Sequence, residues 1–395
     1  MLIGVDATCW SNGRGYGRHA RALLRALVDL DAHNQYTFFF DADPAGVAPG
    51  LPASVRLHWV RSSVPAVLAA AAQGRRSLRD MWRMSWAISR ADLDVVLFPT
   101  IYSYVPVWGR ARKVVMIHDV IAEKFPHLTV PSRRARLAWR AKVALGIRQA
   151  DAIATVSAYS RGHILEHFGL APERVSVVGE ASDAIFRTLD HPSLTPRLLD
   201  AGIHPEGRSI LYVGGFGPHK NLPTLLAAFA ELASQPGFSD VQLILVGEHT
   251  SEVFYTHVDA IRQRVAELGL TDRTVFTGYL TDEELVVLLN LSTVLVLPSW
   301  MEGFGLPAIE AAACGCPSIA TTASPLPELL GAGGLYVDPG QPPQLRKALT
   351  RVLTEPKLRH TMRQAGLAAA QRLTWTAAAR QMHDVLAGVA AYGAA

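Results

Sequence analysis

Two glutamates in one short segment are the side chains of this sequence that best fit chemistry on a sugar or a phosphate. The segment reads Pro298-Ser-Trp-Met-Glu-Gly-Phe-Gly-Leu-Pro-Ala-Ile-Glu310, so Glu302 precedes a glycine turn and Glu310 lies about two turns into the following helix. Backbone N–H groups of the turn can bind phosphate oxygens, and a carboxylate can accept hydrogen bonds from paired sugar hydroxyls. Two unrelated glutamates at a helix start are the alternative, but the pattern is too specific for it. The turn residues concerned are Gly303, Phe304, Gly305 and Leu306.

Lys220 lies in a second glycine-rich turn between an expected strand and a helix. The turn reads Val213-Gly-Gly-Phe-Gly-Pro-His-Lys-Asn221 and contains Gly214. An ammonium group beside the N–H groups of a helix start can neutralise a departing diphosphate. The turn lacks the P-loop spacing G-x-x-x-x-G-K-[ST]. A surface lysine without a function is the alternative.

A third glycine-rich turn follows the first expected strand. It reads Ser11-Asn-Gly-Arg-Gly-Tyr-Gly-Arg18, and Gly15 and Gly17 let the backbone approach a ligand where a helix opens. A phosphate site and a plain glycine turn are both open interpretations. The dinucleotide-binding fingerprint is excluded, because its spacing is absent and no acidic residue follows before Asp29.

Short apolar runs alternate with helical patterns along the chain and define the elements that must position these turns. Strands are expected at 2–6, 36–40, 56–60, 95–99, 113–118, 152–157, 175–178, 209–213, 242–247, 274–277, 294–298 and 317–320. Helices are expected at 17–30, 76–90, 132–150, 160–168, 222–232, 252–268, 282–290, 307–314, 343–353, 357–373 and 376–391. Continuous Val/Ile/Leu strands joined by helices are typical of parallel sheets covered on both faces. The two series predict an α/β fold of two doubly wound domains, divided within residues 179–207, where Pro, Asp and Gly cluster.

The composition indicates a folded protein and narrows its class. The chain has 395 residues, 49% hydrophobic and 18% charged, which excludes disorder as the main state. No apolar run reaches the roughly 18 residues of a spanning helix, and the first residues fit a strand better than a signal peptide. Three cysteines cannot form a disulfide framework, and Cys314 and Cys316 are expected to be buried at a helix end. We therefore expect a reduced, cytoplasmic protein.

The charge is divided unequally along the chain. Residues 1–180 contain 23 Lys and Arg against 14 Asp and Glu, whereas residues 181–395 contain 15 against 20. The basic half is suited to an anionic acceptor, a membrane surface or nucleic acid, and a solvated arginine-rich face is the alternative. No nucleic-acid partner is expected, because neither zinc-finger spacing nor an RNA-binding signature is present.

These motifs together resemble the retaining nucleotide-sugar glycosyltransferases of family 4. The resemblance rests on Glu302-x7-Glu310, on the segments LYVGGFGPHKNLPTLLAAF and VFTGYLTDEEL, and on the glycine turn after the first strand. It covers nearly the whole chain and is strongest across 209–340. It implies the GT-B architecture, in which two Rossmann-like domains face across a cleft. It also implies retaining transfer of a hexose from GDP-mannose or a UDP-sugar to a hydroxyl of a saccharide, glycolipid or small molecule, in polysaccharide or glycoconjugate assembly.

The resemblance also assigns roles to individual residues. It implies that Glu310 binds the ribose hydroxyls, that Glu302 lies beside the donor sugar, and that Lys220 contacts the diphosphate. His118, in the segment VVMIHD, matches a histidine that reaches the transferred sugar, although a buried core histidine is the alternative. His118, Glu302 and Lys220 are therefore the expected catalytic residues. The expected donor-binding residues are Gly15, Gly17, Gly214, Lys220, Gly278, Tyr279, Gly303, Phe304, Gly305, Leu306 and Glu310, with the backbone of Gly278 and Tyr279 beside the base.

The chain departs from the family at positions that bear on phosphate binding. Gly215 stands where many relatives carry Arg, and His219 replaces an Arg of one subgroup. One cation is therefore expected to be missing, or to be supplied by Arg14 or Arg18. Arg14 itself replaces the first glycine of a Gly-Gly-x-Gly loop.

Transfer is expected to need no metal and no other cofactor. Asp41-x-Asp43 and Asp92-x-Asp94 have the spelling of a metal motif. Both lie in expected loops outside the donor motifs, so we interpret them as solvated turn residues.

By the family plan, residues 1–183 form the acceptor-binding domain and residues 184–373 the donor-binding domain. The C-terminal helix, 374–395, is expected to return to the first domain, with hinges near 183 and 373; an extension of the second domain is the alternative. Two basic segments carry tryptophans: 75–90, with Trp82 and Trp86, and 133–148, with Trp139. They either contact the inner face of a membrane or pack on the sheet.

Two competing functions are a non-catalytic nucleotide-sugar binder and a sugar-nucleotide epimerase. A glycoside phosphorylase would need a much longer chain.

Overall fold

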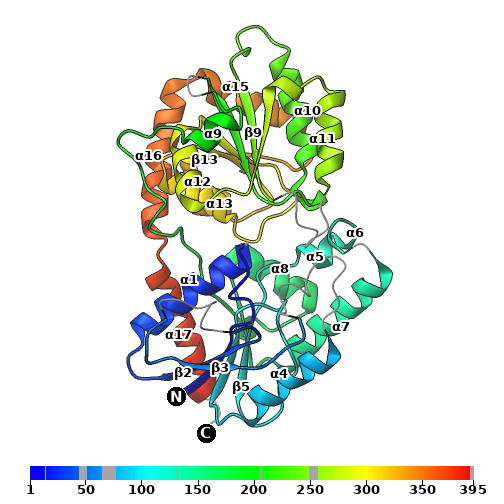
Figure 1. Cartoon of the computed structure of the whole chain (residues 1–395), viewed down its shortest axis with the longest axis vertical. Coiled ribbons are helices and arrows are strands. Elements are labelled where there is room, and N and C mark those ends of the chain that lie inside the picture. Colours follow the sequence, from blue (N-terminus) through cyan, green and yellow to red (C-terminus); the bar gives the residue numbers. More distant parts are fainter. Residues whose placement is uncertain are drawn as a thin grey trace.

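Two parallel β-sheets organise the chain. The computed structural model describes residues 1–13, 15–43, 51–64, 77–130, 132–204, 207–248 and 257–391. The first sheet contains β1 (Leu2–Asp6), β2 (Gln35–Phe40), β3 (Arg56–Trp59), β4 (Val95–Phe98), β5 (Arg112–Met116), β6 (Ala152–Thr155) and β7 (Val175–Val177). The second contains β8 (Ser209–Val213), β9 (Gln242–Val246), β10 (Thr274–Gly278), β11 (Val294–Leu297), β12 (Ser318–Thr321) and β13 (Gly334–Val337). Figure 1 shows the two sheets, each with its own helices, one above the other.

The strand orders are β3-β2-β1-β4-β5-β6-β7 and β10-β9-β8-β11-β12-β13, and the pairings within the described residues are parallel. In each sheet the order reverses beside the first strand, β1 or β8, as in doubly wound folds. The predicted α/β class with two doubly wound sheets is therefore confirmed.

The central strands are buried along their whole length. Every residue of β4, β9, β11 and β12 is buried, because helices cover both faces of a parallel sheet. The edge strand β3 is exposed throughout. The sequence analysis missed β13, because these four residues directly follow the short helical turn Gly331–Gly333 and form no long apolar run.

The long helices agree with the periodic segments of the sequence to within a few residues. They are α1 (Gly15–Leu30), α4 (Leu78–Arg90), α7 (Arg133–Gln149), α8 (Ala158–Phe168), α10 (Leu222–Ala233), α11 (Val258–Glu267), α12 (Asp282–Leu291), α13 (Leu306–Ala313), α15 (Pro342–Thr354), α16 (Pro356–Arg372) and α17 (Trp375–Ala391). The beginnings of the predicted helices 76–90 and 252–268 lie outside the described residues. The prediction missed α5 (Ile121–Lys124), α6 (Pro126–Thr129), α9 (Pro196–Asp200) and α14 (Leu326–Leu330), which are too short to show a period.

The last two helices lie on different parts of the molecule. Helix α16 packs against α13, beside the second sheet, whereas α17 packs against α1 and contacts β4, β5 and β6 of the first sheet (Figure 1). The side chain of Gln381 also accepts a hydrogen bond of 2.9 Å from the backbone N–H of Gly179. The chain therefore returns to the first sheet after completing the second.

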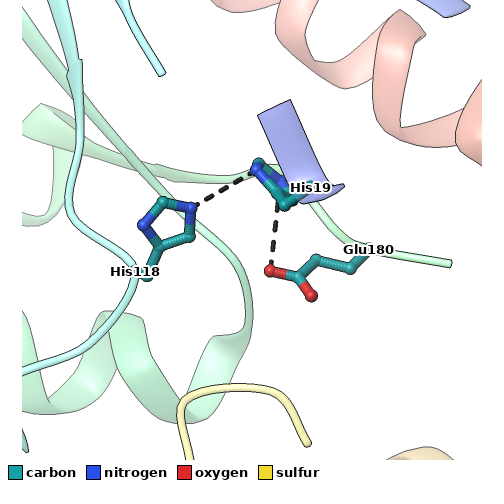
Figure 2. Close-up of side chains that lie close together, drawn as sticks. All are labelled: His19, His118 and Glu180. Atoms are coloured by element: carbon teal, nitrogen blue, oxygen red, sulfur yellow. Dashed lines mark hydrogen bonds and ion pairs between the residues drawn. The ribbon is translucent and has the colours of Figure 1, made fainter. Parts of the chain in front are cut away.

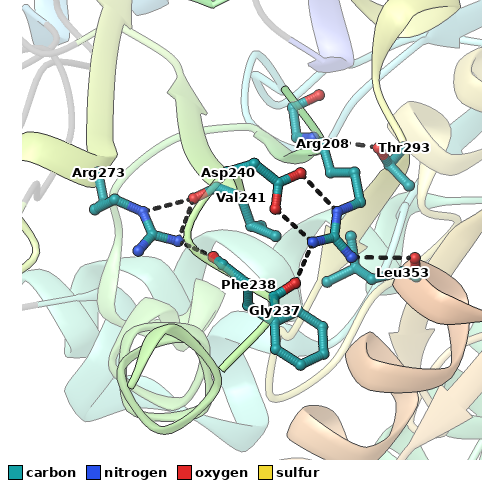
Figure 3. Close-up of polar contacts among 9 residues, drawn as sticks. Arg208, Gly237, Phe238, Asp240, Val241, Arg273, Thr293 and Leu353 are labelled. Carbon is teal, nitrogen blue, oxygen red and sulfur yellow. Dashed lines mark hydrogen bonds and ion pairs between the residues drawn. The ribbon is translucent and has the colours of Figure 1, made fainter. Parts of the chain in front are cut away.

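Two arginines stabilise the amino-terminal edge of the second sheet (Figure 3). Arg208, just before β8, donates to Asp240 (Nε to Oδ2, 2.7 Å) and to the carbonyl oxygen of Gly237. This pairing lowers the pKa of Asp240 to about 2. Arg273, just before β10, donates to the carbonyl oxygens of Phe238 and Val241. These bonds fix the loops at the amino-terminal edge of the sheet, opposite to the edge where the turns with Lys220 and Glu302 follow β8 and β11.

Two sequence expectations about composition can be compared with the structure. The three cysteines are free and buried, which confirms the burial expected for Cys314 and Cys316. Within the ranges described, none of the helices combines the length and the apolar character needed to cross a bilayer.

Candidate active site

The predicted site residues follow the carboxyl ends of strands in both sheets, and these two edges meet. The carbonyl oxygen of Gly303, after β11, accepts hydrogen bonds from the hydroxyls of Ser157 (2.7 Å) and Ser160 (3.0 Å), which follow β6. The short helical turn η2 (Pro218–Lys220), after β8, contacts α6. The motifs of the second sheet therefore lie directly against the first.

Glu302 and Lys220 form an ion pair at this junction. The Lys220 Nζ lies 2.8 Å from Glu302 Oε1, and the Ser299 hydroxyl donates to the same oxygen at 2.6 Å. Glu302 is 8% exposed. Burial alone would raise the pKa of Glu302, but Lys220, Ser299 and His219 together bring it below its ordinary value. Glu302 is therefore a carboxylate at neutral pH and is suited to an electrostatic role rather than to donating a proton.

Gly303, directly after Glu302, lies too close to the first sheet for a side chain. A Cβ placed on Gly303 would lie 2.9 Å from the Cβ of Asp119 and 3.2 Å from the carbonyl oxygen of His118. The turn continues through Phe304 and Gly305, and Leu306 begins α13. Burial raises the pKa of Asp119 to about 6, and Glu123 and Glu302 act in the same direction. The sequence analysis did not select Asp119, although it is the last residue of the VVMIHD segment.

Glu310 is buried within α13 and is paired with an arginine from the first sheet's side. Arg18 Nη2 lies 3.0 Å from Glu310 Oε1, and Arg18 also reaches Asp282 at 2.9 Å and Asp183 at 3.8 Å. Burial raises the pKa of Glu310 to about 7; Arg18 opposes this, whereas Asp282 and Asp183 add to it. Arg18 therefore links α1 to the start of α12 and to the carboxylate predicted to bind ribose.

The other predicted donor-binding residues lie at the ends of three strands. Gly15 and Gly17 are in the first turn of α1, after β1, and a Cβ on Gly17 would lie 2.1 Å from the carbonyl oxygen of Asn12. Gly17 is thus required by the turn itself. Gly214 follows β8, Gly278 ends β10, and Tyr279 is exposed. Arg14, named as a possible phosphate contact, lies outside the described residues.

His118 follows β5 and contacts a second histidine (Figure 2). Its Nε2 lies 3.3 Å from Nδ1 of His19 on α1, and His19 Nε2 lies 3.9 Å from an oxygen of Glu180. Burial lowers the pKa of His118 to about 4, and burial raises the pKa of Glu180 to about 8. Sequence reasoning missed His19 and Glu180, because His19 is on the buried face of α1 and Glu180 lies in no recognisable motif.

The two Asp-x-Asp segments lie at opposite edges of the first sheet, since residues 92–94 precede β4 and residues 41–43 follow β2. Asp94 accepts a 2.7 Å hydrogen bond from the N–H of Leu2, at the amino end of β1, and Asp92 is exposed. Asp43 is exposed too, but Asp41 is 8% exposed, so the interpretation of Asp41 as a solvated turn residue was wrong.

The basic segments of the first sheet's side differ in their exposure. Trp82 and Trp86 on α4 are 55% and 45% exposed and stack on one another, with ring centroids 5.4 Å apart. Trp139 on α7 instead packs against Tyr102 and donates a 2.8 Å hydrogen bond to Glu123. Of these three tryptophans, Trp82 and Trp86 are therefore the two exposed enough to serve as a surface anchor.

A cavity of about 200 Å³ lies between α5, α6, α7 and the end of α8. Its lining includes apolar Trp139 and Phe168 together with Arg136 and Arg140. A smaller neighbouring pocket shares Trp139 with it and reaches His118. The larger cavity thus has a basic rim, and the smaller pocket on the other side of Trp139 is the one lined by His118.

Comparison with known families gives two matches, one for each half of the chain. Residues 13–183 match the model described as Glycosyltransferase Family 4, and residues 200–368 match the model described as Glycosyl transferases group 1.

Curated relatives match mainly over part of their own length. O-antigen chain mannosyltransferase B of Escherichia coli is 28% identical over 294 residues, which is 74% of each chain. The serotype-specific mannosyltransferase WbdA of Escherichia coli is 26% identical over 58% of this chain, but only 27% of WbdA is covered. The D-inositol 3-phosphate glycosyltransferase of Acidothermus cellulolyticus is 31% identical over 58% of this chain and 51% of its own. The chain thus spans about a quarter of WbdA and about half of the inositol-phosphate enzyme.

Solved structures share the fold over the whole chain. Sucrose-phosphate synthase from Thermosynechococcus elongatus gives a TM-score of 0.75 at 21% identity, covering 99% of this chain and 100% of that one. Anabaena HepE in complex with UDP-glucose gives 0.71 at 19% identity, covering 98% and 99%. At these identities the likeness extends to the fold alone.

Proposed function

The chain belongs to glycosyltransferase family 4 and has the GT-B fold, and from this premise we propose that it transfers a hexose from a nucleotide-diphosphate sugar to an acceptor hydroxyl. GDP-mannose is the first donor to test, because two of the relatives are named mannosyltransferases. UDP-glucose is the second, because HepE binds it in a structure of the same fold. The acceptor is a saccharide, a glycolipid or a small molecule, in cytoplasmic assembly of a polysaccharide or glycoconjugate.

The observation that carries this proposal is the pairing of Lys220 with Glu302 where the two sheets meet. Breaking the bond between an anomeric carbon and a diphosphate places negative charge on the leaving group and positive charge on the sugar. Lys220 is a cation for the negatively charged leaving group, and the buried carboxylate of Glu302, 2.8 Å from Lys220, faces the positively charged sugar. A donor whose diphosphate lies at Lys220 would therefore have a cation beside its leaving group and a carboxylate beside its sugar.

Glu310 and Arg18 extend this arrangement to the rest of the nucleotide. Glu310 accepts hydrogen bonds from the ribose hydroxyls, and Arg18, 3.0 Å from it, is placed to contact the nearest phosphate. We propose that Arg18 replaces the cation that Gly215 does not provide. Gly278 and Tyr279 border the base, while Gly214 and residues 303–306 offer backbone to the diphosphate and sugar.

The reaction retains the anomeric configuration and uses no metal in this proposal. The acceptor hydroxyl attacks the anomeric carbon on the face that the diphosphate leaves, and its proton passes to a leaving-group oxygen. The C–O bond to the diphosphate breaks as the new glycosidic bond forms. His118 lies beside the transferred sugar and orients it. Lys220, Arg18 and backbone N–H groups provide the positive charge that a bridging Mg²⁺ supplies elsewhere.

The acceptor is proposed to bind on the first sheet's side. The cavity lined by Arg136, Trp139 and Arg140 has cations for an anionic group and apolar walls for a lipid or sugar face. The exposed pair Trp82 and Trp86 is the proposed contact with the inner face of a membrane. We also propose that residues 1–183 and 184–373 are the two domains, with hinges near residues 183 and 373.

A donor panel tests the function directly. The protein is incubated with GDP-mannose, UDP-glucose and related donors, and release of nucleotide is measured with and without acceptors extracted from membranes. The transferase releases nucleoside diphosphate and yields a product whose anomeric configuration, determined by NMR, matches that of the donor. A nucleotide-sugar binder gives thermal stabilisation without release, and an epimerase converts the donor into its isomer without freeing the nucleotide. Inverted product would remove the retaining mechanism.

A further inference from the structure

Three ligand-type side chains from separate elements converge beside the proposed donor site. His19 comes from α1, His118 follows β5, and Glu180 follows β7 (Figure 2). One nitrogen of each histidine and one oxygen of the glutamate all lie within 4.8 Å of one another. His19 and Glu180 are 1% and 7% exposed. The fold therefore places two imidazoles and a carboxylate around one small volume that is largely shielded from water.

The protein satisfies the two histidines only in part. His118 Nε2 and His19 Nδ1 hydrogen-bond each other at 3.3 Å. Within the described residues, the second nitrogen of each ring, His19 Nε2 and His118 Nδ1, is buried without a hydrogen-bond partner. Glu180 approaches His19 Nε2 only to 3.9 Å, beyond hydrogen-bond distance.

We propose that His19, His118 and Glu180 bind a divalent transition-metal ion of the Zn²⁺ class. Two imidazole nitrogens and one carboxylate oxygen form a donor set typical of zinc. Two nitrogens bound to a tetrahedral zinc at about 2.0–2.1 Å are about 3.3 Å apart, and the measured separation of His118 Nε2 and His19 Nδ1 is 3.3 Å. One oxygen of Glu180 lies within 4.8 Å of one nitrogen of each ring, so the carboxylate must move toward the ion to complete the site.

The protonation states of the site suit metal binding. Imidazole must be neutral to bind a metal, and burial lowers the pKa of His19 and of His118, so both rings are neutral at pH 7. Burial raises the pKa of Glu180 to about 8, so at pH 7 this side chain must release its proton as the ion binds. A fourth position remains for water.

The ion would restrain transfer rather than support it. This step rests on the proposed function, in which His118 orients the donor sugar. A metal that holds the His118 ring withdraws it from the sugar, so occupancy is expected to lower turnover. The binding itself does not depend on that function.

Metal binding is tested on the full chain in the absence of any donor. Protein stripped with EDTA and dialysed is titrated with Zn²⁺, and Co²⁺ serves as the spectroscopic probe. We expect about one equivalent bound, Co²⁺ bands typical of nitrogen and oxygen ligands, and a rise in melting temperature. Glu180→Gln and His19→Ala should each weaken binding about tenfold or more, as loss of a ligand requires. The control His33→Ala, at an exposed histidine between α1 and β2, should bind like the wild type.

Two results would overturn the site: no stoichiometric binding by the wild type, or undiminished binding by both variants. If His19→Ala does not fold, His19→Gln takes its place. Glu180→Gln keeps the side-chain volume, so these two variants together decide whether His19 and Glu180 bind the metal. Transfer is then compared in EDTA and in Zn²⁺. Binding without any loss of transfer refutes the restraining role alone, whereas a protein that binds Zn²⁺ but transfers no sugar keeps the site and loses the proposed function.

Discussion

Removing the positive charge of Lys220 is the most informative perturbation, because it affects stability and transfer through different partners. In Lys220→Met the Glu302 carboxylate, 8% exposed, loses the ammonium group 2.8 Å away. At that distance the pair attracts by about 6 kcal/mol for an effective dielectric constant of 20, before desolvation is subtracted. Breaking one partner of a buried pair typically costs about 3 kcal/mol. We expect a fall in melting temperature of about 6–12 °C, at about 2–4 °C per kcal/mol.

The pH dependence of this loss follows from the direction of the pKa shift. In the wild type the pKa of Glu302 is lowered, so its contribution to stability is present above the ordinary carboxyl pKa and is lost as pH falls through the lower value. In Lys220→Met, burial without the cation raises the pKa of Glu302. Protonation of Glu302 then removes the buried charge, so the variant regains stability as the pH falls. The difference between the two proteins should therefore be greatest near pH 8 and shrink toward pH 4.5.

A double variant separates structure from catalysis. Lys220→Met combined with Glu302→Gln removes both charges of the pair, so thermal unfolding should return to near the wild-type midpoint. Transfer should stay at least 100-fold below wild type, because the diphosphate still lacks its cation. Melting curves and nucleotide release are measured on the same samples. Failure of Glu302→Gln to restore stability, or near-normal transfer by Lys220→Met, would refute the pairing argument.

Three further predictions address the turn, the ribose contact and the surface. Gly303→Ala places a Cβ 2.9 Å from that of Asp119, so transfer should fall more than about tenfold, whereas an unchanged rate would contradict the close approach. The pKa of Glu310 is about 7, so the KM for donor should fall about tenfold from pH 6 to pH 8 as the carboxylate forms, and Glu310→Gln should abolish this slope. Trp82→Ser should reduce co-sedimentation with anionic vesicles at low salt, while Trp139→Phe, which loses the hydrogen bond to Glu123 but keeps an aromatic ring, should sediment like the wild type.

Features encoded within a few residues could be predicted from the sequence, and contacts between distant segments could not. The turn containing Glu302, and the start of the helix carrying Glu310, depend on a strand, glycines and a proline that are adjacent in the chain. Their partners are remote: Gly303 is bound by the Ser157 hydroxyl, 146 residues away. No local pattern selects Ser157 for this contact, since a serine at a helix start is explained by capping alone.

For the same reason, Arg18 was predicted only as a replacement for a missing phosphate-binding cation. Its neighbours in sequence suggest a phosphate, and its actual partners are three carboxylates, Asp183, Asp282 and Glu310, which the fold brings together. His19 gave no signal at all, because a histidine on the buried face of an amphipathic helix has the period of a core residue. Three-dimensional structure was needed to place it against His118.

Both carboxylates of the Glu302-x7-Glu310 motif are already paired with cations before any donor binds, and this constrains how binding proceeds. On the proposed function, the ribose must take Glu310 from Arg18, and the diphosphate must take Lys220 from Glu302. Ribose hydroxyls are neutral, so the first exchange replaces an ion pair by hydrogen bonds to Glu310 and frees Arg18 for the nearest phosphate. In the second exchange the diphosphate replaces Glu302 as the anion beside Lys220. Because Arg18 belongs to α1 and Glu310 to α13, the first exchange also changes the contact between the two sheets. Donor binding and the relative position of the sheets are therefore coupled through Arg18, and no separate lid is needed to sense the nucleotide.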